Sequence, residues 1–216
     1  LENTFRMVNI ALVNELAQLC ASQGIDSWEV IRAAATKPFG FMAFQPGPGV
    51  GGHCIPLDPT YLAWQSRRDV GRPFRIVELA QDVNAEMPAY VARRVVDALN
   101  ARGRSIRGAE ILALGVTYKP NVGDIRESAA IAVLEQLRRL GAKLSFHDPF
   151  VQRLIDGSLR LTRVPLTPAA IARADCVLVL TAHDTYDLEA IASGAQLVFD
   201  TRGTTPRRPG TAVVTL

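Results

Sequence analysis

The sequence predicts an α/β fold in which a helical domain, residues 1–102, is followed by a doubly wound parallel sheet over residues 103–216. Two observations lead to this prediction. Apolar residues recur at helical spacing through most of the first half, and short apolar runs alternate with helical segments after Gly108. A segment rich in glycine and proline, residues 45–59, interrupts the helical half.

Two helices open the chain. From Asn3 to Gln23 apolar residues recur at helical spacing, and Gly24 ends the run. Asp26 can then cap a second helix that reaches about Ala35. The first helix has no capping residue before it, so we expect the chain to be part of a longer protein.

Two further helices follow the glycine-rich segment. The first is expected from about Pro59 to Arg68 and the second from about Phe74 to Arg102, with a kink or a restart at Pro88. The second carries an apolar stripe that suits a link between domains, a subunit interface or an ordinary core face. Periodicity alone does not separate these alternatives.

The second half alternates strands with short helices, which is typical of a parallel, doubly wound sheet. The expected strands are Ile111–Val116, Lys143–His147, Leu159–Val164, Cys176–Thr181 and Leu197–Asp200. The expected helices are Ser128–Leu140, Pro168–Arg173 and Leu188–Ser193.

Composition excludes several classes of protein. The chain has 216 residues, is 48% hydrophobic and carries a net charge of +3 from 24 basic and 21 acidic side chains. No apolar run reaches the roughly 18 residues of a membrane span, and no signal segment opens the chain. We therefore expect a soluble, cytoplasmic protein with no membrane partner. The small, dispersed charge also argues against nucleic acid as a partner.

The three cysteines, Cys20, Cys54 and Cys176, lie far apart and show no metal-ligand spacing, so we expect neither a disulfide framework nor a metal site. Cys20 lies in an apolar helical pattern and Cys176 opens an apolar strand, which predicts that both are buried. Only Cys54 is placed where a thiolate can act.

The segment around Cys54 is the most informative in the chain. Four of the six residues from Gly47 to Gly52 are glycines, which allows the backbone to approach a ligand closely. Cys54 follows after His53, and Asp58 stands four positions later. We interpret this pattern as a thiol held over a substrate, with a carboxylate beside it as a base or water-orienting group.

Two alternative interpretations of this segment are disfavoured. Gly47, Gly49 and Gly52 match the G-x-G-x-x-G pattern of dinucleotide sites, but the preceding segment is broken by proline and glycine where that fingerprint needs a strand. A cysteine hydrolase or acyltransferase would need a histidine base, and His53 is directly adjacent to the cysteine in sequence.

A nucleotide crevice is expected in the second half, because ligands of doubly wound sheets bind at the carboxyl ends of the strands. Lys119 and Arg202 each can place a cation beside a phosphate. The polar residues that fall at that edge are Thr117, Tyr118, Lys119, His147, Asp148, Thr181, His183, Asp184, Thr201 and Arg202.

Five separated motifs, in chain order, resemble the UDP-glucose/GDP-mannose dehydrogenase family of NAD-dependent nucleotide-sugar dehydrogenases. The resemblance covers essentially the whole chain. The motifs are Leu1-Glu2-Asn3-Thr4-Phe5-Arg6, Asn14-Glu15, Gly49-Val50-Gly51-Gly52-His53-Cys54, Tyr118-Lys119 with Gly123-Asp124-Ile125-Arg126-Glu127-Ser128, and Phe199-Asp200-Thr201-Arg202.

Within the family, residues 36–42 and 52–59 resemble the bacterial UDP-N-acetylglucosamine 6-dehydrogenases. UDP-glucose enzymes usually carry a lysine just before the aspartate, where this chain has Leu57, and an arginine before the loop, where it has Lys37-Pro38. UDP-N-acetylglucosamine is therefore the implied substrate. UDP-N-acetylmannosamine, UDP-N-acetylgalactosamine and UDP-glucose remain alternatives, as does an inactive UDP-binding and dimerisation module.

The resemblance implies a central helical domain used in homodimerisation, then a Rossmann-like domain that binds the UDP moiety, without the family's N-terminal NAD-binding domain. It implies NAD as cofactor and a four-electron oxidation of the sugar's C6 alcohol to a carboxylate, in polysaccharide biosynthesis. The family's catalytic lysine and its glutamate base would lie outside this chain.

By resemblance, Cys54 forms a thiohemiacetal and then a thioester, Asp58 activates the hydrolytic water, and Asn3 hydrogen-bonds the oxyanion or that water. Arg126 would reach the NAD. The residues implied to contact the substrate are Gln45, Pro46, Gly47, Pro48, Gly49, Val50, Gly51, Tyr118, Lys119 and Arg202.

Overall fold

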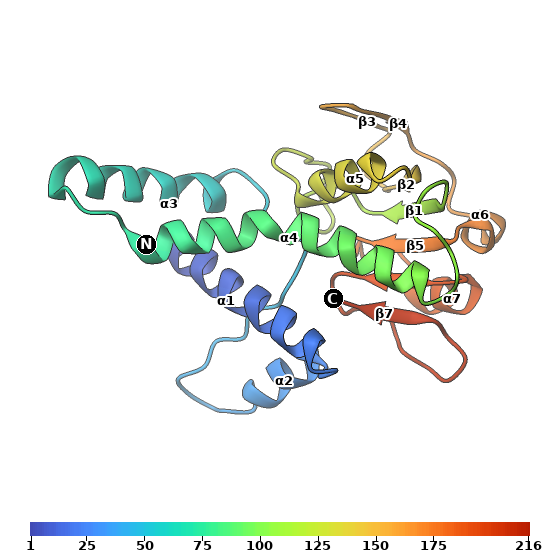
Figure 1. The fold of residues 1–216 in the computed structure, drawn as a ribbon, viewed down its shortest axis with the longest axis horizontal. Coiled ribbons are helices and arrows are strands. Elements are labelled where there is room, and N and C mark those ends of the chain that lie inside the picture. The colour runs from blue at the N-terminus through green and yellow to red at the C-terminus, as the bar shows by residue number, and fades with distance from the viewer. The chain divides into compact units, whose positions relative to one another are not determined.

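A computed structural model describes residues 1–216, which form two compact units, Leu1–Met87 and Pro88–Leu216. The first unit contains helices and irregular segments, and all strands lie in the second (Figure 1). The expected α/β class, a helical part followed by a parallel sheet, is confirmed. The predicted domain boundary at residues 102 and 103 follows the end of α4 (Arg75–Asn100), whereas the two units divide within that helix.

The first two helices match their predictions. α1 spans Glu2–Ser22 and α2 spans Ser27–Ala34. The carboxylate of Asp26 caps α2 by accepting the backbone N–H groups of Trp28 and Glu29. The buried apolar residues that join α1 to the later helices of this unit are Met7, Ala11, Ala63, Val77 and Ala80.

The predicted helix from Pro59 to Arg68 begins too late. α3 spans Cys54–Gln65 and continues as the π-helix η1, Ser66–Val70. Pro56 lies in the first turn, where a backbone N–H has no intrahelical partner, so it does not obstruct the helix. Cys54 is consequently the first residue of a helix rather than part of an irregular loop.

The long helical stretch is one helix, α4, and Pro88 lies inside it rather than at a restart. Because proline has no N–H, the carbonyl of Asn84 loses its usual partner in the helix. No helix in the structure is both long enough and apolar enough to cross a membrane.

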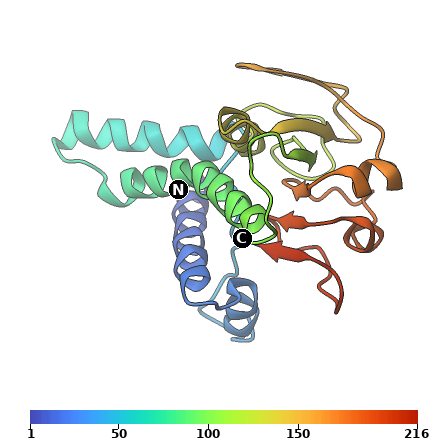
Figure 2. The same cartoon turned by 45° about the vertical axis from the view of Figure 1, so that its right-hand side comes forward.

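Five parallel strands form the sheet of the second unit, in the order β2-β1-β5-β6-β7 (Figure 2). The order reverses between β1 and β5, which makes this a doubly wound sheet with a switch point between those strands. The strands are β1 (Glu110–Leu114), β2 (Lys143–His147), β5 (Cys176–Val179), β6 (Val198–Asp200) and β7 (Val213–Thr215). The helices between them are α5 (Ala129–Arg139), α6 (Pro168–Arg173) and α7 (Leu188–Gly194).

Two strand predictions need correction. The run predicted over Leu159–Val164 does not join the parallel sheet, because β4 (Leu159–Thr162) pairs antiparallel with β3 (Arg153–Asp156) as a separate hairpin. Its residues are mostly exposed or half-buried, whereas every residue of β5 is buried, as a central parallel strand requires. The edge strand β7 was not predicted.

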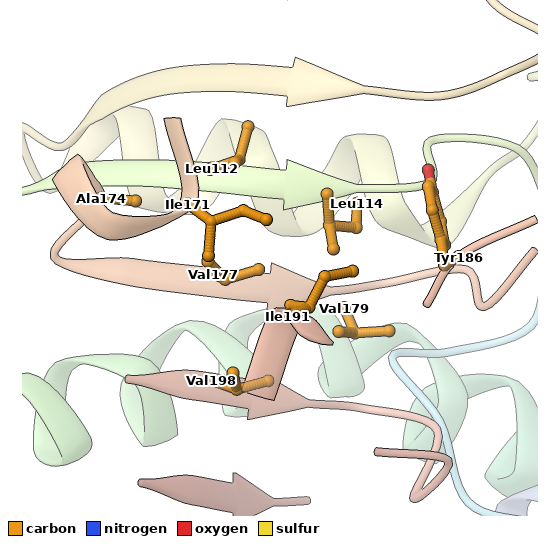
Figure 3. Packing of buried hydrophobic residues seen from close by; sticks show 9 residues of the cluster. All are labelled: Leu112, Leu114, Ile171, Ala174, Val177, Val179, Tyr186, Ile191 and Val198. Atoms are coloured by element: carbon orange, nitrogen blue, oxygen red, sulfur yellow. The ribbon is translucent and has the colours of Figure 1, made fainter. Parts of the chain in front are cut away.

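Alternate residues of the central strands form the core under α6 and α7. Figure 3 shows the side chains of β1, β5 and β6 that point toward these helices. The nine residues of this cluster are Leu112, Leu114, Ile171, Ala174, Val177, Val179, Tyr186, Ile191 and Val198. Close packing of this layer fixes the strands, and therefore the positions of the loops at their carboxyl ends.

Gly115 brings the ends of β1 and β5 together at the switch point. Its φ is +77°, and a Cβ added there would lie 2.2 Å from the carbonyl oxygen of Thr181. Its N–H donates to the carbonyl of His147 at 3.0 Å. Only glycine allows this close approach of the two chain segments.

We predict that Gly115→Ala lowers the free energy of unfolding by about 3 kcal/mol or more, since it combines a left-handed backbone conformation with overpacking. Gly108→Ala is the matched control, because its φ is +82° but no atom lies within 4 Å of the added Cβ. That control should lose only about 1–2 kcal/mol, the cost of the left-handed conformation alone. Urea unfolding measures both, and equal losses would refute a steric role for Gly115.

Candidate functional site

Cys54 is exposed at the first position of α3. The glycine-rich segment turns into this helix through Gly49 and Gly52, which have φ angles of +128° and +88°. Backbone N–H groups in the first turn of a helix have no intrahelical partners and favour negative charge nearby. The fold therefore places the predicted nucleophile beside N–H groups that can donate to an oxyanion.

Asp58 lies four residues after Cys54, on the same face of α3, one turn along. The side-chain amide of Asn3, in the first turn of α1, donates to Oδ2 of Asp58 at 2.6 Å. The structure thus brings together two of the three predicted catalytic residues by a direct contact between residues 55 positions apart, and the third is one helical turn away.

The glycine-rich segment is anchored by Asn14, a residue of α1 to which the sequence analysis gave no role. Asn14 is fully buried, its Oδ1 accepts the N–H of Gly47 at 2.9 Å, and its Nδ2 donates to Oδ1 of Asn84 at 2.9 Å. Asn84 in turn donates to the carbonyl of Met7 at 3.1 Å. A polar residue in a buried helical position is the signal that could have identified this anchor.

The predicted substrate segment is only partly accessible. Pro46, Gly47 and Pro48 are buried, whereas Gln45 is exposed and Gly49, Val50 and Gly51 are half-buried. A cavity of about 220 Å³ adjoins this segment. It is lined by Met7, Val50, Pro56, Gln81, Asn84 and Ala85.

The glycine pattern at Gly47, Gly49 and Gly52 does not form a dinucleotide fingerprint. A helix does open two residues after Gly52, but the first unit has no strand before it. That fingerprint requires a strand, a tight glycine turn and a helix in succession. The residues of this chain therefore do not fit NAD at the position where the pattern occurs.

In the second unit, the segment 117–126 follows β1 at the switch point. Tyr118 is half-buried and Lys119 is exposed, with its Nζ 5.4 Å from the centre of the Tyr118 ring. The carbonyl of Lys119 accepts a hydrogen bond from Oγ1 of Thr117 at 3.0 Å. The segment thus presents a cation and an aromatic ring together, at the edge where doubly wound sheets bind nucleotides.

Arg202 follows β6 at the same edge of the sheet. Its Nε donates to the carbonyl of Leu180 at 2.7 Å, and its backbone N–H donates to Oδ1 of Asp200 at 2.7 Å. Burial lowers the pKa of Arg202 to about 10, and the charge of Asp200 partly opposes this shift. The guanidinium stays charged at neutral pH and is held between the ends of β5 and β6.

Arg126 is highly exposed and forms an ion pair with Asp124 at 2.7 Å. Hydrogen bonds from Arg126 lower the pKa of Asp124 to about 2. The guanidinium already has a carboxylate partner, so a phosphate would have to displace or share that partner. The predicted contact of Arg126 with NAD remains a prediction.

Comparison with known families assigns both units. A model for the central domain of the UDP-glucose/GDP-mannose dehydrogenase family matches residues 1–86, and a model for the UDP binding domain of that family matches residues 112–207. The chain belongs to this family. Each matched segment lies within one of the two compact units.

Several relatives extend the match over nearly the whole chain. The UDP-N-acetyl-D-mannosamine dehydrogenase of Salmonella typhi is 36% identical over 213 residues, 94% of this chain and 48% of that protein. The NDP-N-acetyl-D-galactosaminuronic acid dehydrogenase of Ralstonia nicotianae is 35% identical over 205 residues, 94% of this chain and 46% of that protein. The structure of a UDP-D-ManNAc dehydrogenase from Pyrococcus horikoshii has a TM-score of 0.83 at 29% identity and covers 99% of this chain and 49% of that one.

Two facts follow from these comparisons. The chain spans about half the length of the curated relatives it matches. None of these three relatives is named for N-acetylglucosamine, so the predicted family is confirmed but the predicted preference for UDP-N-acetylglucosamine is not supported.

Proposed function

We propose that this chain supplies the central and UDP-binding parts of an enzyme that oxidises the C6 alcohol of a UDP-sugar to a carboxylate. The observation that carries the proposal is the contact of Asn3 with Asp58, one helical turn from the exposed Cys54. The overall reaction converts the alcohol, one water and two NAD⁺ to the carboxylate, two NADH and three protons. NAD, as hydride acceptor, would be bound mainly by residues outside this chain, with Arg126 as the predicted contact from within it.

Cys54 supplies the covalent step. An aldehyde carbon is not tetrahedral and becomes a hydride donor only after a nucleophile adds to it. The thiolate forms a bond to C6, and the former carbonyl oxygen takes a proton. After the second oxidation the same sulfur holds C6 as a thioester.

Asp58 and Asn3 act on the hydrolysis of that thioester. Water attacks C6, its proton passes to the Asp58 carboxylate, and the bond between C6 and sulfur breaks to release the thiolate. Because Asn3 donates to Oδ2 of Asp58, its amide fixes the orientation of the carboxylate during this step. A cysteine hydrolase based on His53 has no comparable support, since no hydrogen bond orients that imidazole toward the thiol.

For the substrate, we propose a UDP-N-acetylhexosamine, with UDP-N-acetylmannosamine as the first candidate. The names of the Salmonella typhi and Pyrococcus horikoshii relatives support this choice. UDP-N-acetylgalactosamine, UDP-N-acetylglucosamine and UDP-glucose are the alternatives, and comparison of NADH production from the four UDP-sugars by the whole protein decides among them.

We further propose that the protein acts in the cytoplasm.

The second candidate function is a UDP-binding and dimerisation module without catalytic activity. It is supported by features that need nothing beyond this chain, namely Lys119 and Arg202 at the carboxyl edge of the sheet and the exposed apolar side chains of α1 and α4. The two functions differ in whether the whole protein forms NADH with a UDP-sugar, and complete lack of NADH would favour the module.

We predict that Cys54→Ala in the whole protein abolishes formation of the acid, because the other two thiols are buried. Asp58→Asn should slow hydrolysis more than oxidation, so that a covalent adduct becomes visible by intact mass. Cys20→Ala is the control for loss of a thiol and should retain turnover. Acid formation at the wild-type rate by Cys54→Ala, or loss of turnover in Asp58→Asn without an adduct, would contradict these roles.

We predict that residues 1–216 bind UDP more tightly than NAD, since Lys119 and Arg202 are retained and no dinucleotide fingerprint is present. Lys119→Ala and Arg202→Gln should each weaken UDP binding about tenfold, the effect of losing one charged hydrogen bond. Lys143→Ala is the matched control, because Lys143 begins β2 at the opposite edge of the sheet. Calorimetric titration compares the ligands, and tighter binding of NAD would contradict the assignment.

We also propose a homodimer formed through the central helices. Large apolar side chains of α1 and α4 are at least half exposed, an arrangement typical of interaction surfaces. They are Leu12, Leu19, Ile76 and Leu79, with exposed fractions of 62%, 60%, 54% and 60%. Sedimentation should give twice the 23.4 kDa of one chain at micromolar concentration, and a monomer alone would exclude this interface.

A further inference from the structure

His183 is a fully buried imidazole in the loop that follows β5, and both of its ring nitrogens have partners. Its Nδ1 accepts the backbone N–H of Asn121 at 2.9 Å. Its Nε2 lies 3.0 Å from Oδ2 of Asp148, at the end of β2. One side chain therefore connects the loops that follow three strands of the sheet.

These partners define the tautomer of His183. A backbone N–H can only donate, so Nδ1 must carry a free lone pair and the ring proton must lie on Nε2. Nε2 then donates to Asp148, which is already fixed by the N–H groups of Val116 at 2.8 Å and Phe150 at 2.9 Å. Burial raises the pKa of Asp148, but the hydrogen bonds from His183, Val116 and Phe150 outweigh it and lower that pKa overall.

The atom that His183 holds lies within the predicted UDP-binding segment. Asn121 follows Lys119 by two positions and has a left-handed backbone with φ of +63°. Its side chain pairs reciprocally with Asp184, donating to the carboxylate at 2.7 Å and accepting the N–H of Asp184 at 3.1 Å. The unusual conformation at Asn121 is thus fixed from both its main chain and its side chain.

A second link ties the start of the segment to the same loop. The hydroxyl of Thr181 donates to the carbonyl of Thr117 at 2.7 Å, and the hydroxyl of Thr117 donates to the carbonyl of Lys119. Lys119 therefore lies between two fixed points, Thr117 and Asn121. Its side chain is exposed, but its backbone has little freedom.

We propose that His183 is a positioning residue for UDP binding, which holds the backbone at Asn121 so that Lys119 meets the diphosphate at the switch point. The inference rests on the proposed UDP-binding function of this edge. His183 does not touch the ligand. It acts on the segment mainly through the hydrogen bond that Nδ1 accepts from Asn121, and its Nε2 makes a longer contact with Oγ1 of Thr117 at 3.4 Å. Asp148 supports this positioning role by fixing the imidazole of His183, and Asp184 supports it by fixing the side chain of Asn121.

Two substitutions separate this role from a general contribution to stability. In His183→Asn the amide oxygen can replace Nδ1 as acceptor for Asn121, whereas in His183→Gln the amide nitrogen can replace Nε2 as donor to Asp148. Each variant keeps one hydrogen bond and loses the other. We expect both to unfold at lower urea concentrations than the wild type and to bind UDP differently.

Calorimetric titration of residues 1–216 with UDP tests the proposal. His183→Asn should bind UDP within about threefold of the wild type and His183→Gln about tenfold or more weakly, the latter corresponding to about 1.4 kcal/mol. Tyr186→Phe is the matched control. It removes a partly buried hydrogen bond from the Tyr186 hydroxyl to the carbonyl of His147 at 2.9 Å, beside the same imidazole but without a link to residues 117–126. Its UDP affinity should stay within about twofold of the wild type.

The outcomes distinguish UDP binding at the carboxyl edge of the sheet from the positioning role of His183. If the wild type does not bind UDP, the proposed function of this edge fails and the positioning role fails with it. If the wild type binds but the Asn and Gln variants weaken binding equally, or Tyr186→Phe weakens it as much, only the positioning role is overturned. Long-range ¹H–¹⁵N NMR of the imidazole should show the proton on Nε2, and a proton on Nδ1 would also overturn it.

Discussion

The irregular segments of this protein depend on one constraint, that a buried polar group must find a hydrogen-bond partner. In each unit, buried side chains accept the N–H groups of segments that have no regular structure. Asn14 holds Gly47 in the first unit, and Asp148 holds Val116 and Phe150 in the second. Asp200, the last residue of β6, does the same for the segment that follows it, by accepting the N–H groups of Arg202, Thr204 and Thr205. The residues that carry candidate chemistry lie on the segments so fixed.

The apolar core has a different task in the two units. In the second unit, alternate side chains of β1, β5 and β6 pack under α6 and α7, so the carboxyl edge of the sheet is a rigid platform. In the first unit the cluster around Met7 and Val77 is small, and the contact that matters for chemistry, between Asn3 and Asp58, is exposed. The positions of Asn3 and Asp58 are set by the helices that carry them, because the geometry of α1 and α3 fixes the direction in which each side chain leaves the backbone.

Local rules predicted α1, α2 and α5 well. Apolar spacing indicated all three helices, Gly24 and Gly141 follow the ends of α1 and α5, and Asp26 caps α2. They failed at α3, where Pro56 and Pro59 disguised a helix that begins at Cys54. Whether β4 joins the parallel sheet or a separate hairpin depends on its pairing with β3. The short alternating run of β4 itself therefore could not show which sheet the strand belongs to. Among the site residues, the motifs indicated Cys54, Asp58 and Asn3 by resemblance, but the contact between Asn3 and Asp58 is tertiary and has no local signature. Asn14 was indicated as part of a family motif and His183 as a polar residue at the carboxyl edge of the sheet, but their hydrogen bonds to Gly47 and Asn121 are tertiary and have no local signal.

The burial of the cysteines has a consequence for the reactivity of the whole chain. Cys20 is 5% exposed and Cys176 is fully buried, and burial raises the pKa of Cys176 to about 12. Peroxides and soft electrophiles react with thiolates that they can reach, so these two sulfur atoms are inert. The exposure that lets Cys54 meet an aldehyde equally admits an oxidant. Among the three cysteines, oxidants and electrophiles therefore act on this chain through Cys54 alone.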